Sequence, residues 1–209
     1  MTYSVKEIFY TLQGEGRQTG RAAVFCRFAG CNFWSGREQD RSEADCSFCD
    51  TDFIGTDGQG GGKFKTAEAL AKTARKIWGN KDGTPFIVCT GGEPLMQLDS
   101  PLIKAFQAEG FEVAVETNGS LPCPPELDWI CVSPKNLDKL VQTTGDELKL
   151  VYPQEPVKPE DVAKLDFKHF YLQPLDEEGK DHTKTTVDYC LNHPRWTLSL
   201  QTHKILGID

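Results

Sequence analysis

Short apolar runs recur along the chain and are separated by glycine, proline or polar residues. Runs that are rich in β-branched and aromatic residues and bounded in this way are typical of strands. They predict strands at 3–12, 22–30, 85–90, 111–117, 129–133, 148–152, 169–173 and 196–202. Apolar residues spaced three and four apart predict helices, because this period places them on one helical face. Helices are expected at 67–78 behind Thr66, from Asp99 or Ser100 to before Gly110, at 159–165 and around 183–192.

The order of these elements predicts an α/β fold. Strands return every twenty to thirty residues after a helix or a loop, which is the pattern of a parallel sheet. A closed eight-stranded barrel needs more chain than these elements provide. We therefore expect a partial (incomplete) TIM-like barrel of about six mostly parallel strands with helices outside, formed by a single domain over residues 1–209.

One long polar region, from Cys31 to about Lys65, interrupts this alternation. It contains the glycine-rich tract GQGGG at 58–62, so a loop is expected there rather than regular structure. A loop of this length in a compact domain is usually functional. We expect it at the C-terminal rim of the barrel strands.

Polar residues follow four of the predicted strands at the point where each strand ends. They are Thr90–Glu93, Thr117–Asn118, Ser133–Lys135 and Gln173–Pro174. Any one of them alone is explained as an ordinary turn between a strand and a loop. Four at the same edge indicate a ligand site, because α/β folds bind ligands beyond the carboxyl ends of their strands.

Composition narrows the classes of partner and location. The formal net charge is −8 and the basic residues form no block, whereas binding to nucleic acid needs Lys and Arg on a common face. A small-molecule partner is expected instead of nucleic acid. No apolar run approaches the roughly 20 residues that span a bilayer, and residues 1–16 lack the layout of a signal peptide. We therefore expect no membrane contact and a cytoplasmic location.

Three of the eight cysteines fall in one stretch, Cys31, Cys46 and Cys49, and the last two form a C-x-x-C pair. Thiolate ligands favour zinc or an iron–sulfur cluster. A closed zinc site needs a fourth ligand, and the nearest histidine, His169, is over a hundred residues away. A four-iron cluster held by three cysteines leaves one iron open. The pattern favours iron–sulfur, with structural zinc and unliganded core cysteines as alternatives.

Five segments in a fixed order carry a resemblance to a known family. They are FYTLQGEGRQTGRAAVFCRFAGCN, CSFCDT, TGGEP, ETNG and SPK, from about residue 8 to residue 135. As a set they resemble the 7-carboxy-7-deazaguanine synthases of the radical S-adenosylmethionine (SAM) superfamily, although TGGEP or ETNG alone is weak. Most of the superfamily has three residues between the first two cysteines, whereas fourteen separate Cys31 from Cys46. This longer interval resembles a variant within the synthase group.

The resemblance implies an enzyme with three cofactors. Cys31, Cys46 and Cys49 would bind a [4Fe–4S] cluster whose open iron chelates SAM, and reduction would cleave SAM to a 5′-deoxyadenosyl radical. The radical would take hydrogen from C6 of 6-carboxy-5,6,7,8-tetrahydropterin. The ring would contract to 7-carboxy-7-deazaguanine with loss of ammonia and regeneration of SAM, a step of queuosine biosynthesis. Mg²⁺, which takes few protein ligands, would be held by the hydroxyl of Thr51; taken alone, Thr51 would be an ordinary loop threonine.

The resemblance also implies roles for individual residues. Those expected to bind SAM are Phe48, Asp50, Gly92, Glu93, Asn118, Ser133, Lys135 and Gln173. Those expected to bind the substrate are Leu12, Gln13, Gly14, Glu15, Arg27, Thr90 and His203. Arg27 suits a carboxylate because its guanidinium forms bidentate pairs, and Glu15 suits the N–H donors of an aminopyrimidine. The alternative for Arg27 is a surface arginine at a strand end. A lone histidine such as His203 is more often structural, and Asp50 alone would be a solvated loop charge.

The resemblance further implies a homodimer that receives electrons from an external reductant such as flavodoxin or ferredoxin. Two other functions stay open at this point. A glycyl-radical-enzyme activase shares the cluster and the rim motifs, but many activases carry extra cysteine pairs that this sequence lacks. A zinc-stabilised binding module would bind a partner and catalyse nothing.

Overall fold

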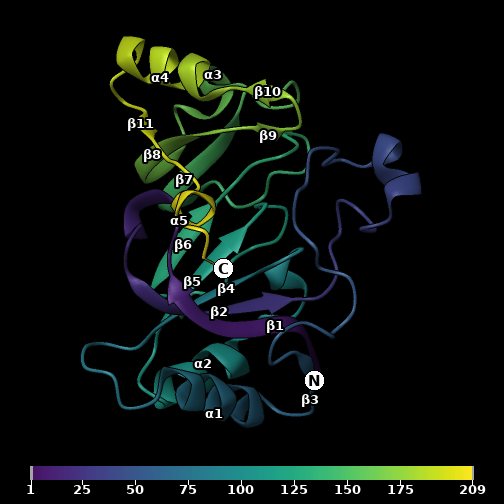
Figure 1. The fold of residues 1–209 in the computed structure, drawn as a ribbon, viewed down its shortest axis with the longest axis vertical. Coiled ribbons are helices and arrows are strands. Elements are labelled where there is room, and N and C mark those ends of the chain that lie inside the picture. The colour runs from purple at the N-terminus through teal and green to yellow at the C-terminus, as the bar shows by residue number, and fades with distance from the viewer. Residues whose placement is uncertain (1, 209) are drawn as a thin grey trace.

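The computed structural model describes residues 2–208 and is organised around one nine-stranded sheet (Figure 1). In the order in which they lie, its strands are β11 (Thr197–Leu198), β8 (Asp166–Pro174), β7 (Thr144–Tyr152), β6 (Trp129–Val132), β5 (Glu112–Thr117), β4 (Phe86–Gly91), β2 (Ala22–Phe28), β1 (Tyr3–Leu12) and β3 (Gly62–Phe64). The strands from β11 to β2 pair in parallel, and β1 pairs antiparallel with β2 and β3. The expected partial barrel is confirmed, with seven parallel strands where about six were expected.

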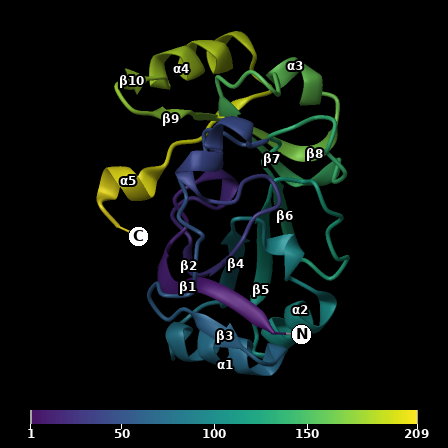
Figure 2. The same cartoon turned by 90° about the vertical axis from the view of Figure 1, so that its right-hand side faces the viewer.

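Most helices lie at the two ends of the molecule, and the last helix of the chain lies between them (Figures 1 and 2). The α-helices are α1 (Ala67–Trp78), α2 (Ser100–Ala108), α3 (Pro159–Val162), α4 (Thr183–Asn192) and α5 (Thr202–Leu206). Short 3-10 turns η1 (Gly16–Gln18), η2 (Glu38–Glu43) and η3 (Pro94–Met96) and a hairpin of β9 (Asp176–Glu177) and β10 (Lys180–Asp181) complete the fold. Within residues 2–208, no helix combines the length and apolarity needed to cross a membrane.

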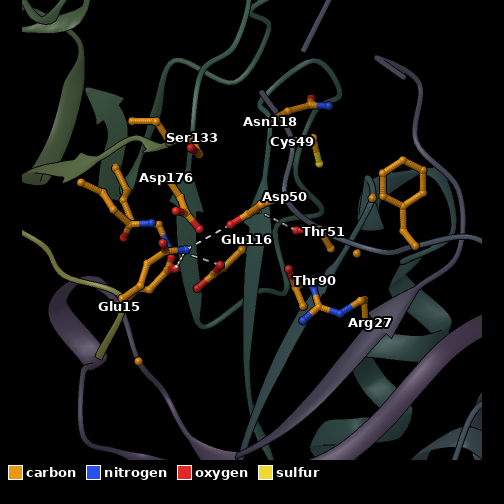
Figure 3. Close-up of a pocket in the computed structure, with 18 of the residues that line it drawn as sticks. Glu15, Arg27, Cys49, Asp50, Thr51, Thr90, Glu116, Asn118, Ser133 and Asp176 are labelled. Carbon is orange, nitrogen blue, oxygen red and sulfur yellow. Dashed lines mark hydrogen bonds and ion pairs between the residues drawn. The ribbon is translucent and has the colours of Figure 1, made fainter. Parts of the chain in front are cut away.

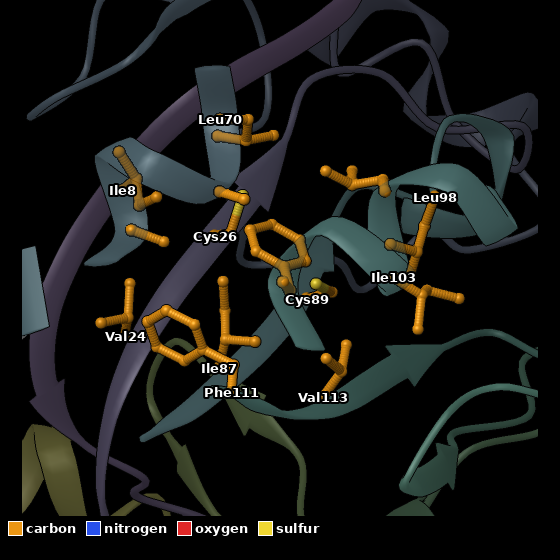
Figure 4. Close-up of a cluster of buried hydrophobic side chains, with 14 of the residues drawn as sticks. Ile8, Val24, Cys26, Leu70, Ile87, Cys89, Leu98, Ile103, Phe111 and Val113 are labelled. Carbon is orange, nitrogen blue, oxygen red and sulfur yellow. The ribbon is translucent and has the colours of Figure 1, made fainter. Parts of the chain in front are cut away.

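Helix α1 begins and buries its face as its sequence predicts. The Thr66 side chain accepts a hydrogen bond from the Ala69 amide and so satisfies one of the free N–H groups of the first turn. Leu70 and Ala74 lie one turn apart and are fully buried against the sheet. The main hydrophobic core therefore lies between α1, α2 and strands β1, β2, β4 and β5 (Figure 4).

Side chains along the strands point alternately into the hydrophobic core and to the opposite face of the sheet. In β7, Leu148 and Leu150 belong to a second apolar cluster beneath α3 and α4, whereas Lys149 between them lines a cavity. In β2, Cys26 is buried in the core and Arg27 lines the same cavity. Because successive side chains of a strand point to opposite faces, one face is apolar and packed and the other carries polar groups.

The last predicted strand, 196–202, is mostly wrong. Only Thr197–Leu198 pair with β8, and the chain then leaves the sheet to form α5. The Thr202 amide and hydroxyl both donate to the Gly14 carbonyl, at 2.9 and 2.8 Å. This contact spans 188 residues, so the local apolar pattern carries no signal for it.

The glycine-rich tract in the expected loop is packed tightly against β1. The Gly58 amide donates to the Lys6 carbonyl at 2.9 Å, and the Ile8 amide donates to the Gln59 carbonyl at 2.7 Å. A Cβ on Gly61 would lie 2.2 Å from the Lys6 carbonyl oxygen. The glycines are needed for this close approach of two backbones, and the tract ends in the short strand β3.

Candidate active site

The polar face of the sheet opens into a cavity of about 430 Å³. The cavity lies where the segments after β1, β2, β4, β5, β6 and β8 come together, and its volume is in the range of small-molecule sites. Figure 3 shows side chains from these segments converging on it. Except for Glu93, all the residues that the sequence analysis assigned to a site lie on its wall.

The three cysteines Cys31, Cys46 and Cys49 line this cavity as free thiols. The Cys31 sulfur accepts a hydrogen bond from the Phe33 amide at 3.4 Å. The Cys46 thiol donates to the Cys49 sulfur; this hydrogen bond lowers the pKa of Cys49 and, together with burial, raises the pKa of Cys46. Three free thiols at the edge of an open cavity fit a cluster that keeps one iron accessible to a small molecule.

The insertion at 32–45 holds the cysteine pair in place. Arg41 donates from one nitrogen to the Ser47 carbonyl at 2.9 Å and to the Cys49 carbonyl at 3.0 Å. Its guanidinium also lies over the Trp34 ring, 4.1 Å from the ring centroid. On the other side of the pair, Asp45 accepts from Lys139 at 2.6 Å. Side chains of the insertion thus bond to the backbone of the C-x-x-C turn and to the loop after β6.

The turn after β4 brings the first cysteine against the strand ends. A Cβ on Gly92 would lie 2.0 Å from the Gly30 carbonyl oxygen and 3.0 Å from the Cys31 Cβ. The Glu93 amide donates to the same Gly30 carbonyl at 2.9 Å. Any side chain at Gly92 would therefore displace the segment that carries Cys31, and Gly92 offers only its backbone to the cavity.

Glu93 itself does not line the cavity, and its carboxylate is bonded within the protein. It is fully buried, and its oxygens accept from the Thr117 hydroxyl at 2.7 Å, the Asn118 amide at 2.8 Å and the Leu95 amide at 3.0 Å. Burial raises its pKa, and these donors offset part of that rise. Oε1 accepts two of these hydrogen bonds and Oε2 accepts one, so the carboxylate holds the turn at 117–118 in place and Oε2 keeps one acceptor site.

Polar side chains expected to contact SAM stand around the cysteine wall. Lys135 donates to the Ser133 hydroxyl at 2.8 Å and lies 5.2 Å from the centroid of the Phe48 ring. The Asn118 side-chain amide donates to the Asn32 side chain at 3.0 Å. Gln173 lines the cavity, and its side-chain oxygen accepts from the Ser199 hydroxyl at 3.0 Å. Asn118, the Ser133–Lys135 pair and Gln173 come from three strand ends, those of β5, β6 and β8, as the rim pattern predicts, and Phe48 comes from the cysteine loop.

The loop residues Asp50 and Thr51 follow the cysteine pair directly. The Asp50 carboxylate accepts from Lys204 of α5 at 2.8 Å, and the Thr51 hydroxyl donates to the other Asp50 oxygen at 3.4 Å. Lys204 also reaches Asp176 at 2.5 Å, so α5 is linked to both sides of the cavity mouth. Within the part of the chain that the structure describes, no three His, Cys, Asp or Glu side chains are grouped to hold a single metal ion.

A buried ion network forms the wall opposite the cysteines. Lys149 contacts Glu15 at 2.5 Å and Glu116 at 3.3 Å. The Gln13 amide donates to Glu116 at 2.8 Å, and Gln201 donates to Glu15 at 3.1 Å. Burial opposes ionisation of Glu15, but the charge and hydrogen bond of Lys149 outweigh it and lower the pKa. This wall therefore presents carboxylate oxygens to a ligand, which suits N–H donors.

A guanidinium stands apart from this network. Arg27 is bonded through Nε to Glu7 at 2.7 Å, and its side chain is 22% exposed. Its two terminal nitrogens form no hydrogen bond within residues 2–208, and the group lies beside Thr90 in Figure 3. Glu7 fixes one edge of the guanidinium, and the other edge is free for a carboxylate.

The remaining expected substrate residues form the floor of the cavity near α5. A Cβ on Gly14 would lie 2.3 Å from the His203 ring nitrogen Nδ1, so the ring packs directly on the backbone. Leu12, at the end of β1, is partly exposed and also borders the cavity. Both ends of the described chain thus contribute to one site.

Several cavity residues escaped the sequence analysis. They are Lys6, Glu7, Glu116, Lys149, Asp176, Gln201 and Lys204. A signal existed for Lys149, because a lysine inside the apolar run LKLVY implies a buried or site-facing cation. No comparable signal existed for Gln201 and Lys204, which reach the cavity only because the chain leaves the sheet after β11.

Comparison with known proteins places this chain in a family. The family model of the Radical SAM superfamily matches residues 40–147. The chain is 61% identical to a 7-carboxy-7-deazaguanine synthase of Caulobacter vibrioides and 38% identical to one of Bacteroides thetaiotaomicron, with all of both chains covered in each case. It also resembles the crystal structure of QueE from Escherichia coli, at 25% identity and a TM-score of 0.71, over 96% of this chain and 94% of that one. The chain therefore belongs to the 7-carboxy-7-deazaguanine synthase family of the radical SAM superfamily.

Proposed function

We propose that this chain converts 6-carboxy-5,6,7,8-tetrahydropterin to 7-carboxy-7-deazaguanine, with ring contraction and loss of ammonia, as a lyase of queuosine biosynthesis. One observation carries the proposal: the three free cysteine thiols and the carboxylates of the Glu15–Lys149–Glu116 network open into the same cavity. A radical generator and an aminopyrimidine-binding wall are both needed for this reaction. Family membership adds independent support.

The cysteine wall would hold the cofactors. Cys31, Cys46 and Cys49 would ligate a [4Fe–4S] cluster, which together with SAM supplies one-electron chemistry and a carbon radical for hydrogen abstraction. Gly92, through its backbone, and the side chains of Phe48, Asp50, Asn118, Ser133, Lys135 and Gln173 would bind SAM. Glu93 would act from behind the wall by holding the Asn118 backbone.

The opposite wall would bind the pterin. Gln13, Gly14 and Glu15 would receive its 2-amino-4-oxopyrimidine edge, with Leu12, Thr90 and His203 around it. Arg27 would pair with its carboxylate through the guanidinium edge that Glu7 leaves free. Water is kept from much of this wall, since Gln13 and Lys149 are each at most 5% exposed. Charge-assisted hydrogen bonds are stronger in such a site than in water.

Mg²⁺ belongs to the proposal as the third cofactor. Thr51 would supply a hydroxyl ligand, and the substrate carboxylate and water would complete the shell, because Mg²⁺ prefers oxygen ligands and keeps several waters. Thr51 lies on the cavity wall next to the cysteine pair. This position is between the proposed sites of SAM and of the pterin.

We also propose the wider context of the activity. The chain would act as one domain, as a homodimer, on a small molecule and not on nucleic acid, with flavodoxin or ferredoxin as the electron donor. The continuous nine-stranded sheet supports a single domain. The formal charge of −8 supports a small-molecule substrate instead of nucleic acid.

Anaerobic reconstitution with iron and sulfide tests the proposed function. With SAM, Mg²⁺ and a reductant, the reconstituted chain is expected to turn the carboxytetrahydropterin into the carboxydeazaguanine without net consumption of SAM. Production of 5′-deoxyadenosine alone, with no deazaguanine, would overturn the proposal. A protein that binds zinc and gives no SAM-dependent spectral change would point to a binding module instead.

A further inference from the structure

Lys149 is the buried cation at the centre of the wall opposite the cysteines. It lies in β7 between Leu148 and Leu150, which are fully buried, and it is itself 4% exposed. A charge in this position loses most of its hydration and is tolerated only with close partners. Its partners are carboxylates from two other elements, Glu15 after β1 and Glu116 in β5.

Both oxygens of each carboxylate are bonded within the protein. One Glu15 oxygen contacts Lys149 and the other accepts from Gln201, while one Glu116 oxygen contacts Lys149 and the other accepts from Gln13. A carboxylate oxygen has two acceptor sites, so every one of these oxygens can still accept a donor from a ligand. Figure 3 shows Glu15 and Glu116 next to each other. Without a cation between them, two neighbouring carboxylates would repel, and one would bind a proton or turn away.

We propose that Lys149 is the positioning residue that gives this cavity its preference for a ligand bearing an exocyclic amino group, because it keeps Glu15 and Glu116 together as a paired acceptor. The inference rests on the proposed function and names the determinant of its substrate class. An amino group next to a ring N–H presents two parallel donors, and a fixed carboxylate is their natural acceptor. Lys149 itself acts through the carboxylates and needs no contact with the ligand.

The test compares the carboxytetrahydropterin with its analogue that lacks the 2-amino group. For each enzyme the discrimination is the ratio of the two values of kcat/KM. The variants are Lys149→Met, which removes the charge, and Lys149→Arg, which keeps it. Lys168→Met serves as the matched control, because Lys168 lies on the neighbouring strand β8, pairs with Asp146 at 2.7 Å and has a side chain that is 72% exposed.

Lys149→Met is expected to lower the discrimination by about 10- to 100-fold, the loss that follows from one charge-assisted hydrogen bond, and to do so mainly through KM. Lys149→Arg and Lys168→Met are expected to keep the discrimination of the wild type. Iron content and SAM affinity should be unchanged in all three variants. In Lys149→Met combined with Glu15→Gln, the discrimination should be no lower than in Glu15→Gln alone, because Lys149 acts through Glu15.

An equal fall in kcat/KM for both ligands in Lys149→Met would overturn the inference and leave Lys149 as a structural residue. If Lys149→Met does not fold, Lys149→Gln replaces it. It removes the charge that keeps Glu15 and Glu116 together, so the same fall in the discrimination is expected. Failure of the wild type to form product would overturn the proposed function instead. The inference is then decided by equilibrium binding of the two ligands to the SAM-loaded wild type and variant.

Discussion

At the scale of single residues, Gly92 decides how closely the segment with Cys31 approaches the strand ends. We expect Gly92→Ala to push this segment away, because the new Cβ would lie 2.0 Å from the Gly30 carbonyl oxygen. Iron content after reconstitution should fall and turnover should drop by about 100-fold or more, as misplacement near 1 Å does in other active sites. Gly110→Ala is the control: its φ of 87° strains any side chain, but the Cβ meets open space. Normal iron content in Gly92→Ala would contradict the assignment.

Glu15 gives the site a defined response to acid. Burial raises its pKa, but Lys149 outweighs burial and the net pKa is lowered; Glu116, Glu147 and His203 also face this region. The stabilisation from its ionised form is therefore present above the ordinary glutamate pKa of 4.5 and is lost as the pH falls through the lowered value. We expect the difference in unfolding free energy between wild type and Glu15→Gln to shrink below that pH. Denaturant titrations across the acid range measure this difference in unfolding free energy. A difference that grows as the pH falls would contradict a lowered pKa of Glu15.

At the scale of elements, the segment after the cysteines is fixed to β1 by one lysine. Lys6 contacts Asp52 at 2.9 Å, Asp57 at 2.8 Å and the Ile54 carbonyl at 2.9 Å. Because both carboxylates are largely exposed, Lys6→Met is expected to lower the unfolding free energy only slightly. Hydrogen exchange at residues 51–57 should rise more than elsewhere. Lys63→Met, at an exposed position in β3, is the control and should change neither quantity.

The insertion at 32–45 makes a separate prediction about cluster lifetime. Arg41→Ala removes the two bonds to the Ser47 and Cys49 carbonyls and the contact with Trp34. The reconstituted variant should lose iron several-fold faster to a chelator than the wild type, while its fold by circular dichroism stays unchanged. Equal rates of iron loss would mean that the insertion serves another purpose.

Local sequence patterns predicted the elements that depend on local physics. The caps and apolar period of α1 and α2, and the apolar runs of β1, β2, β4, β5 and β6, match the structure closely, since each is stabilised by its own neighbours in sequence. The meeting of the rim residues at one cavity was predictable for a different reason, because the ends of parallel strands share one edge. Strand β11 and helix α5 were not, because the Thr202–Gly14 contact that ends the strand is remote in sequence. The pairing of Lys149 with Glu15 and Glu116 depends on register across three elements and has no local signature.

At the scale of the whole molecule, the chain brings two chemically different walls together across one sheet. The cysteine wall comes from the long segment after β2, and the carboxylate wall comes from β1, β5, β7 and α5. The core between the sheet and its helices lies on the other face, so the site is built without interrupting the main apolar packing. This separation allows the cavity to carry buried charges while the opposite face provides stability.

The central claim is that hydrogen abstraction and pterin binding take place in this one cavity. The most direct measurement is an anaerobic turnover with carboxytetrahydropterin that carries deuterium at C6, followed by mass spectrometry of the product and of the recovered SAM. The account predicts carboxydeazaguanine formed over many turnovers and deuterium in the recovered SAM, because SAM is regenerated after each abstraction. Product formed without deuterium in SAM, or deuterated 5′-deoxyadenosine that accumulates without product, would contradict it.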